Sequence, residues 1–168
     1  MSRWRVDHGD EFVLGGVEQG KIGRSYDTKK KKAVTAVQLT KEGKLRRMYA
    51  LGIEDFSSRS LESIFANHIS KSAQITTDKW KGYIPIAKAY NITQMESNYG
   101  LNFKALHTMN HQIKSWIRTT YSWVSDFHLD RYFNEFCYTN RSQSKETIFN
   151  NLITKMVNKE KVYQKYLV

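Results

Sequence analysis

The order of strand and helix signals in the first part of the chain limits the fold more than any other feature of the sequence. Three strand-like segments come first, and turns between them predict an antiparallel meander. Serines that can cap a helix follow, and then two short strands with a short helix between them. The predicted segments are strands 4–14, 33–39 and 45–53, a helix ending at His68, a strand 73–77, a short helix 84–89 and a strand 92–96.

This order predicts an α/β, RNase H-like mixed sheet flanked by helices. The first and fourth strands of such a sheet are neighbours, so Asp10 and Asp78 are expected to meet. Two carboxylates at adjacent strand ends repel each other unless a cation neutralises them, and oxygen ligands suit Mg²⁺ or Mn²⁺. Taken alone, Asp78 is also explained as the cap of the next helix.

Apolar residues at helical spacing predict three C-terminal helices, over residues 102–118, 127–138 and 145–166. The last helix is expected to carry an apolar stripe inward and lysines outward; the stripe is Ile148, Leu152, Ile153, Met156 and Val157. We therefore expect one RNase H-like domain over residues 1–141 and a C-terminal helical extension, residues 142–168, packed on it.

The charge of the chain points to an acidic partner. Lys and Arg number 27 against 16 Asp and Glu, which gives a formal net charge of +11. Nucleic acid is the first partner that this balance indicates, before an anionic membrane surface or an acidic protein. Cys137 is alone, so neither an internal disulfide nor a cysteine zinc site is expected. Without an apolar run of membrane-spanning length or a signal peptide, we expect a cytoplasmic protein with no membrane partner.

Five motifs occur in an order that resembles the catalytic domain of a family of bacterial insertion-sequence transposases of the DDE type. Members of this family have an RNase H-like core, usually preceded by a zinc ribbon and a helical DNA-binding region. The motifs are Asp10-Glu11-Phe12-Val13-Leu14-Gly15-Gly16, Gly23-Arg24-Ser25-Tyr26, Thr77-Asp78-Lys79-Trp80-Lys81-Gly82-Tyr83, His107-Thr108-Met109 with Lys114-Ser115-Trp116-Ile117-Arg118, and Tyr132-Phe133-Asn134-Glu135-Phe136.

The resemblance implies roles for the matching residues. Asp10 and Asp78 are the first and second metal ligands, bridging two Mg²⁺ or Mn²⁺ ions, and Glu11 supports the first ligand. The third catalytic position, Glu or Asn in relatives, aligns with Gln112. If the helix register differs from this alignment, the third position falls on one of three other residues, which are Asn110, His111 and Glu135.

The resemblance also implies metal-dependent DNA cleavage and strand transfer by a homo-oligomer assembled on transposon ends and target DNA, close to the bacterial nucleoid. Lysines, an arginine and a tryptophan are expected to contact the DNA. They are Lys29, Lys30, Lys31, Lys32, Lys79, Trp80, Lys81, Lys114 and Arg118.

The sequence departs from the family pattern at three places. Gln112 offers a neutral amide in place of the usual ligand, and the segment 138–141 lacks one position and one basic residue of the family's Arg-x-Asn-Arg ending. The first catalytic strand begins a few residues after Met1, so we expect an N-terminally truncated copy. Two other hypotheses therefore stay open: a non-catalytic DNA-binding module, and a regulatory fragment that pairs with a full-length transposase.

Overall fold

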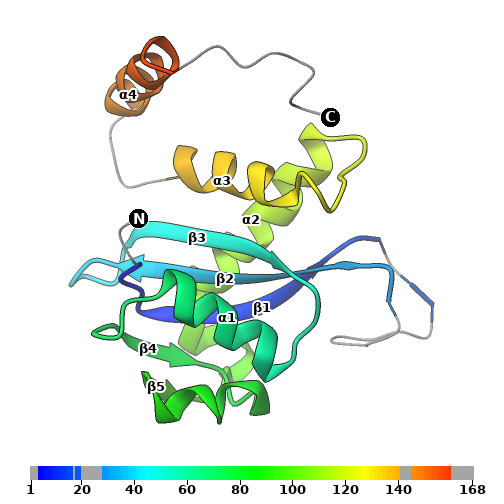
Figure 1. Ribbon diagram of the computed structural model, residues 1–168, viewed down its shortest axis with the longest axis vertical. Coiled ribbons are helices and arrows are strands. Elements are labelled where there is room, and N and C mark those ends of the chain that lie inside the picture. Colours follow the sequence, from blue (N-terminus) through cyan, green and yellow to red (C-terminus); the bar gives the residue numbers. More distant parts are fainter. Residues whose placement is uncertain (1–3, 17, 20–27, 141–144, 160–168) are drawn as a thin grey trace.

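A five-stranded mixed sheet with helices on both faces forms the body of the molecule (Figure 1). The computed structural model describes residues 4–16, 18–19, 28–140 and 145–159, so the motif at 23–26 lies outside the described residues. The strands are β1 (His8–Leu14), β2 (Lys31–Leu39), β3 (Leu45–Ile53), β4 (Gln74–Thr77) and β5 (Asn91–Gln94). The α-helices are α1 (Ser58–His68), α2 (Lys104–Thr120), α3 (Leu129–Thr139) and α4 (Lys145–Val157).

The strand order in the sheet is β3-β2-β1-β4-β5. The first three strands form an antiparallel meander, whereas β4 runs parallel to β1 and β5 runs parallel to β4. The predicted RNase H-like α/β architecture is confirmed. The single short helix predicted over 84–89 is instead a pair of 3₁₀ helices, η1 (Lys81–Tyr83) and η2 (Ile86–Lys88), separated at Pro85, which has no backbone N–H to continue a helix.

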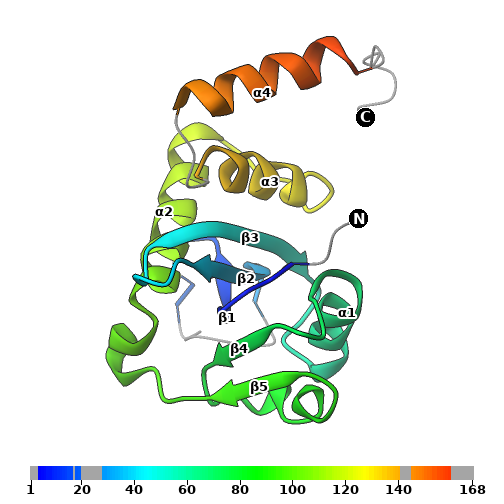
Figure 2. The ribbon, with the colours of Figure 1, turned by 90° about the vertical axis from the view of Figure 1, so that its left-hand side faces the viewer.

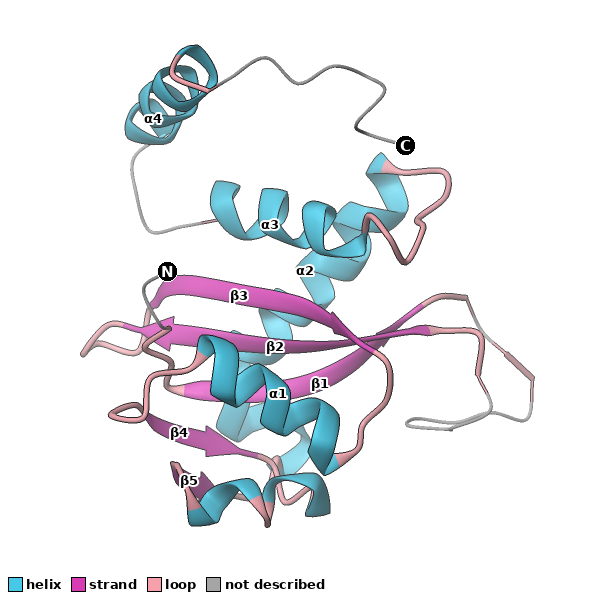
Figure 3. Ribbon diagram, in the orientation of Figure 1, coloured by secondary structure: helices cyan, strands magenta, loops and turns pink. Residues whose placement is uncertain are grey.

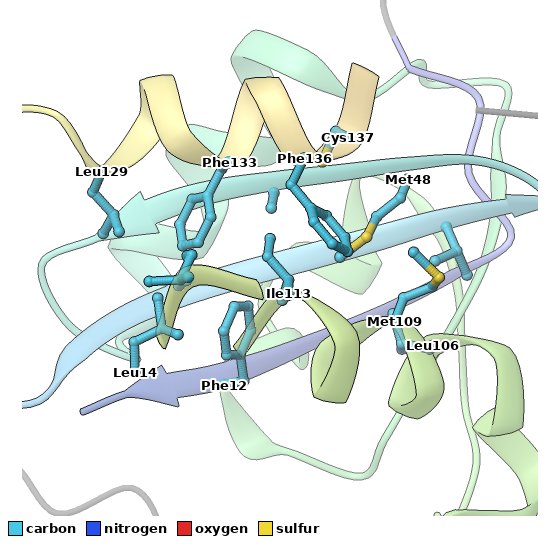
Figure 4. Close-up of a cluster of buried hydrophobic side chains, with 14 of the residues drawn as sticks. Phe12, Leu14, Met48, Leu106, Met109, Ile113, Leu129, Phe133, Phe136 and Cys137 are labelled. Carbon is cyan, nitrogen blue, oxygen red and sulfur yellow. The ribbon is translucent and has the colours of Figure 1, made fainter. Parts of the chain in front are cut away.

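Two hydrophobic cores fix the sheet, one on each face. In Figure 2, α1 and α2 lie on opposite sides of the sheet. Figure 4 shows the larger core, in which side chains of β1, α2 and α3 meet over the sheet; they include Phe12, Leu106, Ile113, Phe133 and Phe136. The smaller core packs α1 and the 3₁₀ segments against the other face through Val34, Leu61, Phe65, Ile75 and Tyr83. Because both faces are covered, the middle of β2, residues 33–37, is buried without alternation.

Helix α4 departs from its prediction. It lies beyond α3, away from the sheet (Figure 3). Leu152, Ile153, Met156 and Val157 are all exposed, so the prediction that this stripe points inward is wrong for these residues. Hydrophobic spacing predicted the helix, but it carries no information on whether a packing surface lies within reach.

The start of α1 is fixed by a hydrogen-bonded cap. Ser57 Oγ accepts from the Ser60 N–H at 3.3 Å, and Asp55 Oδ1 accepts from the Ser57 N–H at 2.9 Å and from the Ser60 hydroxyl at 2.6 Å. These hydrogen bonds lower the pKa of Asp55 to about 2, and the charge of Lys32 contributes slightly. The cap also positions Phe56, whose carbonyl contacts the candidate site described below.

We predict that Asp55→Asn lowers the free energy of unfolding by about 0.5–1 kcal/mol at pH 7, because a charge-assisted acceptor becomes neutral. The folded pKa lies below the ordinary value of 3.8, so this stabilisation is present above that pH and is lost as the pH falls toward 2. Urea denaturation of both proteins from pH 7 to pH 3 measures it. Glu54→Gln, at the exposed neighbouring carboxylate, is the control, and a difference that stays constant over this range contradicts the prediction.

Candidate active site

Strand pairing brings the two predicted aspartates together. Gly9 of β1 pairs with Thr77, the last residue of the parallel strand β4, so Asp78 follows beside Asp10. The carboxylates of Asp10, Glu11 and Asp78 offer ligand atoms that all lie within 4.8 Å of one another. The prediction that the first and fourth strands are neighbours is confirmed, and the cluster contains one carboxylate more than the two assigned as ligands.

Glu11 reaches this cluster from the other face of the sheet. Its register partner Val34 belongs to the core on the α1 side, whereas the next residue, Phe12, belongs to the core on the α2 side. Glu11 is only 5% exposed. Strand β4 ends at Thr77, so no later β4 residue pairs with β1 beside Glu11. The longer Glu11 side chain therefore reaches the two aspartates from the α1 face of the sheet.

Tyr83 forms the floor beneath the carboxylates. Burial raises the pKa of its phenol well above the usual value, and the nearby charge of Glu11 raises it further, with smaller effects from Asp10 and Asp78. The phenol therefore stays protonated at pH 7, with its hydroxyl on the buried side of the cluster near Glu11.

The residues after Asp78 form a compact turn that positions its carboxylate. Asp78 Oδ1 accepts from the Trp80 N–H at 3.0 Å, and the Trp80 indole Nε1–H donates to the Phe56 carbonyl at 3.1 Å. Gln94 Nε2 donates to the carbonyls of Asp78 (3.2 Å) and Trp80 (2.9 Å). Gly82 allows this turn to close, because a Cβ there would lie 2.6 Å from Trp80 Nε1 and 3.1 Å from Leu61 Cδ1.

Helix α2 supplies one wall of the cleft that contains the carboxylates. His107, Asn110, His111 and Lys114 line it, at the spacing of one helix face. Asn110 is only 5% exposed, and the Thr35 hydroxyl lies 2.7 Å from its Oδ1. Thr35 is the register partner of Asp10, so the Asn110 amide lies next to the first aspartate.

Gln112, the residue aligned with the third catalytic position, is not among the residues that line the cleft. It is exposed on α2, two positions after Asn110, and two helical positions turn a side chain by about 200°. Glu135 is not there either, because it lies on α3 and accepts a hydrogen bond from the Tyr121 hydroxyl at 2.8 Å. Of the positions considered from the sequence, Asn110 and His111 are the ones at the cleft.

The cations predicted to bind DNA fall into two groups. Lys114 lies in the cleft wall, with its Nζ 5.2 Å from the centroid of the Phe12 ring. Burial lowers the pKa of Lys114; Asp10 opposes this effect, and the positive charges of Lys30 and Arg118 add to it. Positive charge is therefore concentrated beside the first aspartate.

The other predicted DNA-contacting residues lie around this centre. Lys79 and Lys81 are exposed beside Asp78, and Lys79 pairs with Glu96 at 2.7 Å. Lys31 pairs with Asp126 at 2.7 Å, and Lys32 donates to the Glu54 carbonyl at 3.3 Å. Trp80 also lines the cleft, although its indole N–H is engaged within the protein.

The neutral imidazole of His107 completes the cleft. Burial lowers its pKa, and the neighbouring His111 and Lys114 lower it further, whereas Asp78 raises it. Its Nε2 lies 3.4 Å from the Ser97 hydroxyl, and its ring packs edge-on against Phe103. At pH 7 this side chain adds hydrogen-bonding capacity to the cleft and no positive charge.

The model of one protein family, described as the ISXO2-like transposase domain, matches residues 5–141 of the chain. The chain belongs to this family of insertion-sequence transposases. Among curated proteins, none matches the sequence. Transposases of the DDE type act on DNA and normally use divalent metals, so the family supports a function in DNA transposition, and the acidic cluster has the ligand atoms to hold such a metal. In the described part of this transposase domain, no helix is long and apolar enough to cross a membrane.

Sequence reasoning missed the placement of Tyr83 and the pairing of Thr35 with Asn110. A signal for the second was present, because Thr35 is a polar residue inside an otherwise apolar strand, and a buried hydroxyl needs a partner. The placement of Tyr83 depends on the packing of η1 against the α1 face of the sheet, a tertiary contact that no local sequence pattern encodes.

We predict that Gly82→Ala lowers the free energy of unfolding of the transposase domain by about 2–3 kcal/mol, because the added methyl group displaces Trp80. Urea denaturation followed by tryptophan fluorescence measures the change. Gly16→Ala is the control, since a Cβ at Gly16 meets no atom within 4 Å. Equal effects of the two substitutions would mean that close packing at Gly82 is not required.

Proposed function

We propose that this chain carries out metal-dependent DNA cleavage and strand transfer during transposition of an insertion sequence, with Asp10 and Asp78 as metal ligands. The observation that carries the proposal is the convergence of three carboxylates within 4.8 Å in a cleft whose rim is positively charged. Hard oxygen ligands of this density suit Mg²⁺ or Mn²⁺ better than softer metals.

The residues present fit such an ion. Asp10 and Asp78 each have one oxygen held by a backbone N–H, from Glu11 at 2.9 Å and from Trp80 at 3.0 Å, which restricts the rotation of both carboxylates. Glu11 adds a third carboxylate, with the Tyr83 phenol behind it. A bound divalent cation supplies two effects at this place, activation of the attacking oxygen and neutralisation of the phosphate charge.

We propose Asn110, rather than Gln112, as the third position. The Thr35 hydroxyl lies 2.7 Å from the Asn110 Oδ1 and 3.3 Å from the Asp10 carbonyl oxygen. Because a hydroxyl has one proton, it can donate to only one of these two oxygens at a time. When Thr35 donates to the carbonyl, the amide turns and donates its Nδ2–H to Thr35. The amide Oδ1 then faces the cleft, where it offers a neutral oxygen ligand.

The reaction follows from these placements. Water attacks a phosphodiester in the cleft, the P–O3′ bond breaks, and a free 3′-hydroxyl and a 5′-phosphate result. That 3′-hydroxyl then attacks a phosphodiester of the target, which forms the new bond and releases a target 3′-hydroxyl. Throughout, Lys114 holds a non-bridging phosphate oxygen from the wall of the cleft, and no covalent protein intermediate forms.

A second candidate function is a DNA-binding or regulatory remnant without catalysis. One observation favours it: among the described residues that line the cleft, α2 supplies an amide, two imidazoles and an ammonium group, and no carboxylate. This candidate keeps the basic surface and the fold, and it differs from the first in metal affinity and in cleavage.

Metal binding gives the first test. We expect Asp10→Asn and Asp78→Asn each to weaken Mn²⁺ binding by about tenfold or more, measured by titration calorimetry without DNA. Glu62→Gln, at an exposed carboxylate on α1, is the matched control and should bind like the natural chain. Equal Mn²⁺ affinity in all four proteins would exclude the carboxylate cluster as the metal site.

Nicking of supercoiled plasmid DNA in Mn²⁺ gives the second test, because it requires no particular end sequence. We expect the natural chain to nick, both Asp→Asn variants to lose about 100-fold or more, and Asn110→Ala to lose about tenfold. Gln112→Ala should stay within about twofold, since its side chain is exposed away from the cleft. If Gln112→Ala loses nicking activity and Asn110→Ala keeps it, the third catalytic residue is Gln112 and the assignment to Asn110 is wrong. A natural chain that binds Mn²⁺ and DNA but does not nick would support the remnant.

A further inference from the structure

A second depression, distinct from the cleft, lies between the end of β1 and the C-terminal half of α2. Its volume is about 600 Å³, and it is closed on one side by the loop of residues 121–124. Both apolar and cationic side chains line it. The apolar ones include Leu14, Ile117 and Trp123, and the cationic ones include Lys29, Lys31 and Arg118. Lys114 lines both this groove and the cleft, so the two lie next to each other.

The charges around the groove attract an anion. Burial lowers the pKa of Lys114, and the nearby positive charges of Lys30 and Arg118 lower it further. Lys31 is paired with the exposed Asp126 at the rim. A phosphate between Lys114 and Arg118 relieves the repulsion between these two cations, and this site is on the route from the groove to the carboxylates.

Trp123 gives the groove a stacking surface. Its side chain is 77% exposed, which leaves a large apolar face in contact with water. Trp80 differs, because it is partly buried and donates its indole N–H to the Phe56 carbonyl. Of the two tryptophans, Trp123 is therefore the one with an open ring face, and every nucleic-acid base can stack on such a face.

We propose that this groove binds an unstacked nucleotide of the DNA strand next to the phosphate that is cut, with its base on Trp123 and its phosphate between Lys114 and Arg118. The inference rests on the proposed function, which places the cut phosphate in the cleft. A volume of about 600 Å³ is in the range of small-molecule pockets, roughly 300–1,000 Å³, which is large enough for one nucleotide. Trp123, which no family motif contains, becomes a binding residue.

Binding of two DNA probes tests the proposal: a duplex with a short single-stranded thymidine overhang, and the same duplex with blunt ends. Fluorescence anisotropy is measured with the full chain in EDTA, so the result does not depend on the metal site. We expect Trp123→Ala to weaken binding of the overhang probe by about fivefold to 100-fold, and of the blunt probe much less. Trp123→Phe should restore most of the loss, because a phenyl ring also stacks.

Two further variants make the test specific. Phe127→Ala is the matched control, since Phe127 is 70% exposed on the same connection between α2 and α3 but does not line the groove. Arg118→Gln should weaken both probes and reduce the slope of log affinity against log salt by about 1.

Equal affinity of Trp123→Ala and the natural chain for the overhang probe overturns the proposal, and so does a loss that Phe127→Ala reproduces. The outcome is separable from that of the proposed function. Asp78→Asn should bind the overhang probe at least as tightly as the natural chain, because it removes a negative charge from the cleft, even though it fails to nick. A chain that nicks normally after Trp123→Ala, with unchanged overhang binding, refutes the groove and leaves the catalytic proposal standing.

Discussion

Mutual repulsion of the three carboxylates is the constraint on which the rest of the structure depends. Two unit charges about 5 Å apart repel by roughly 3 kcal/mol at an effective dielectric constant of about 20. The ligand oxygens of Asp10, Glu11 and Asp78 lie at or below this separation. The opposing free energy comes from the pairing of β1 with β4 and from burial on both faces of the sheet.

The two cores explain why the site can draw on both faces. On the α2 side, Phe12 and Ile113 fix the distance between β1 and the helix, which places Asn110 beside Asp10. On the α1 side, Leu61 and Phe65 hold η1 against the sheet, which places Tyr83 beneath Glu11. The end of β4 at Thr77 lets residues from the two faces of the sheet meet, since a strand extending beyond Thr77 would separate Glu11 from Asp78. The geometry of the carboxylate cluster is thus a consequence of where one strand ends.

Much of this arrangement could be predicted from the sequence, because it follows from local patterns and known topology. Alternation, turns and caps located all five strands within a few residues, and the strand order made Asp10 and Asp78 neighbours. Two other features could not be found in this way. The motif alignment that assigns the third position to Gln112 says nothing about the direction of a helical side chain, which is set by the buried stripe of α2: Asn110 lines the cleft and Gln112 is exposed. The apolar residues of α4 fitted a packed helix, yet packing needs a surface that only the tertiary structure determines.

The neutral amide on α2 has to be judged together with Glu11. A third carboxylate is already present in the cluster, supplied by β1 and not by the helix. A further carboxylate at Asn110, buried beside Asp10, would add a fourth negative charge to a space where three already repel one another. The Asn110 amide carries no charge, and its Oδ1 accepts a hydrogen bond from the Thr35 hydroxyl at 2.7 Å. The protonated Tyr83 phenol meanwhile stabilises negative charge on the buried side of the cluster. An uncharged residue in the wall of the cleft is therefore compatible with a metal site, because Glu11 supplies the third carboxylate from the opposite face of the sheet.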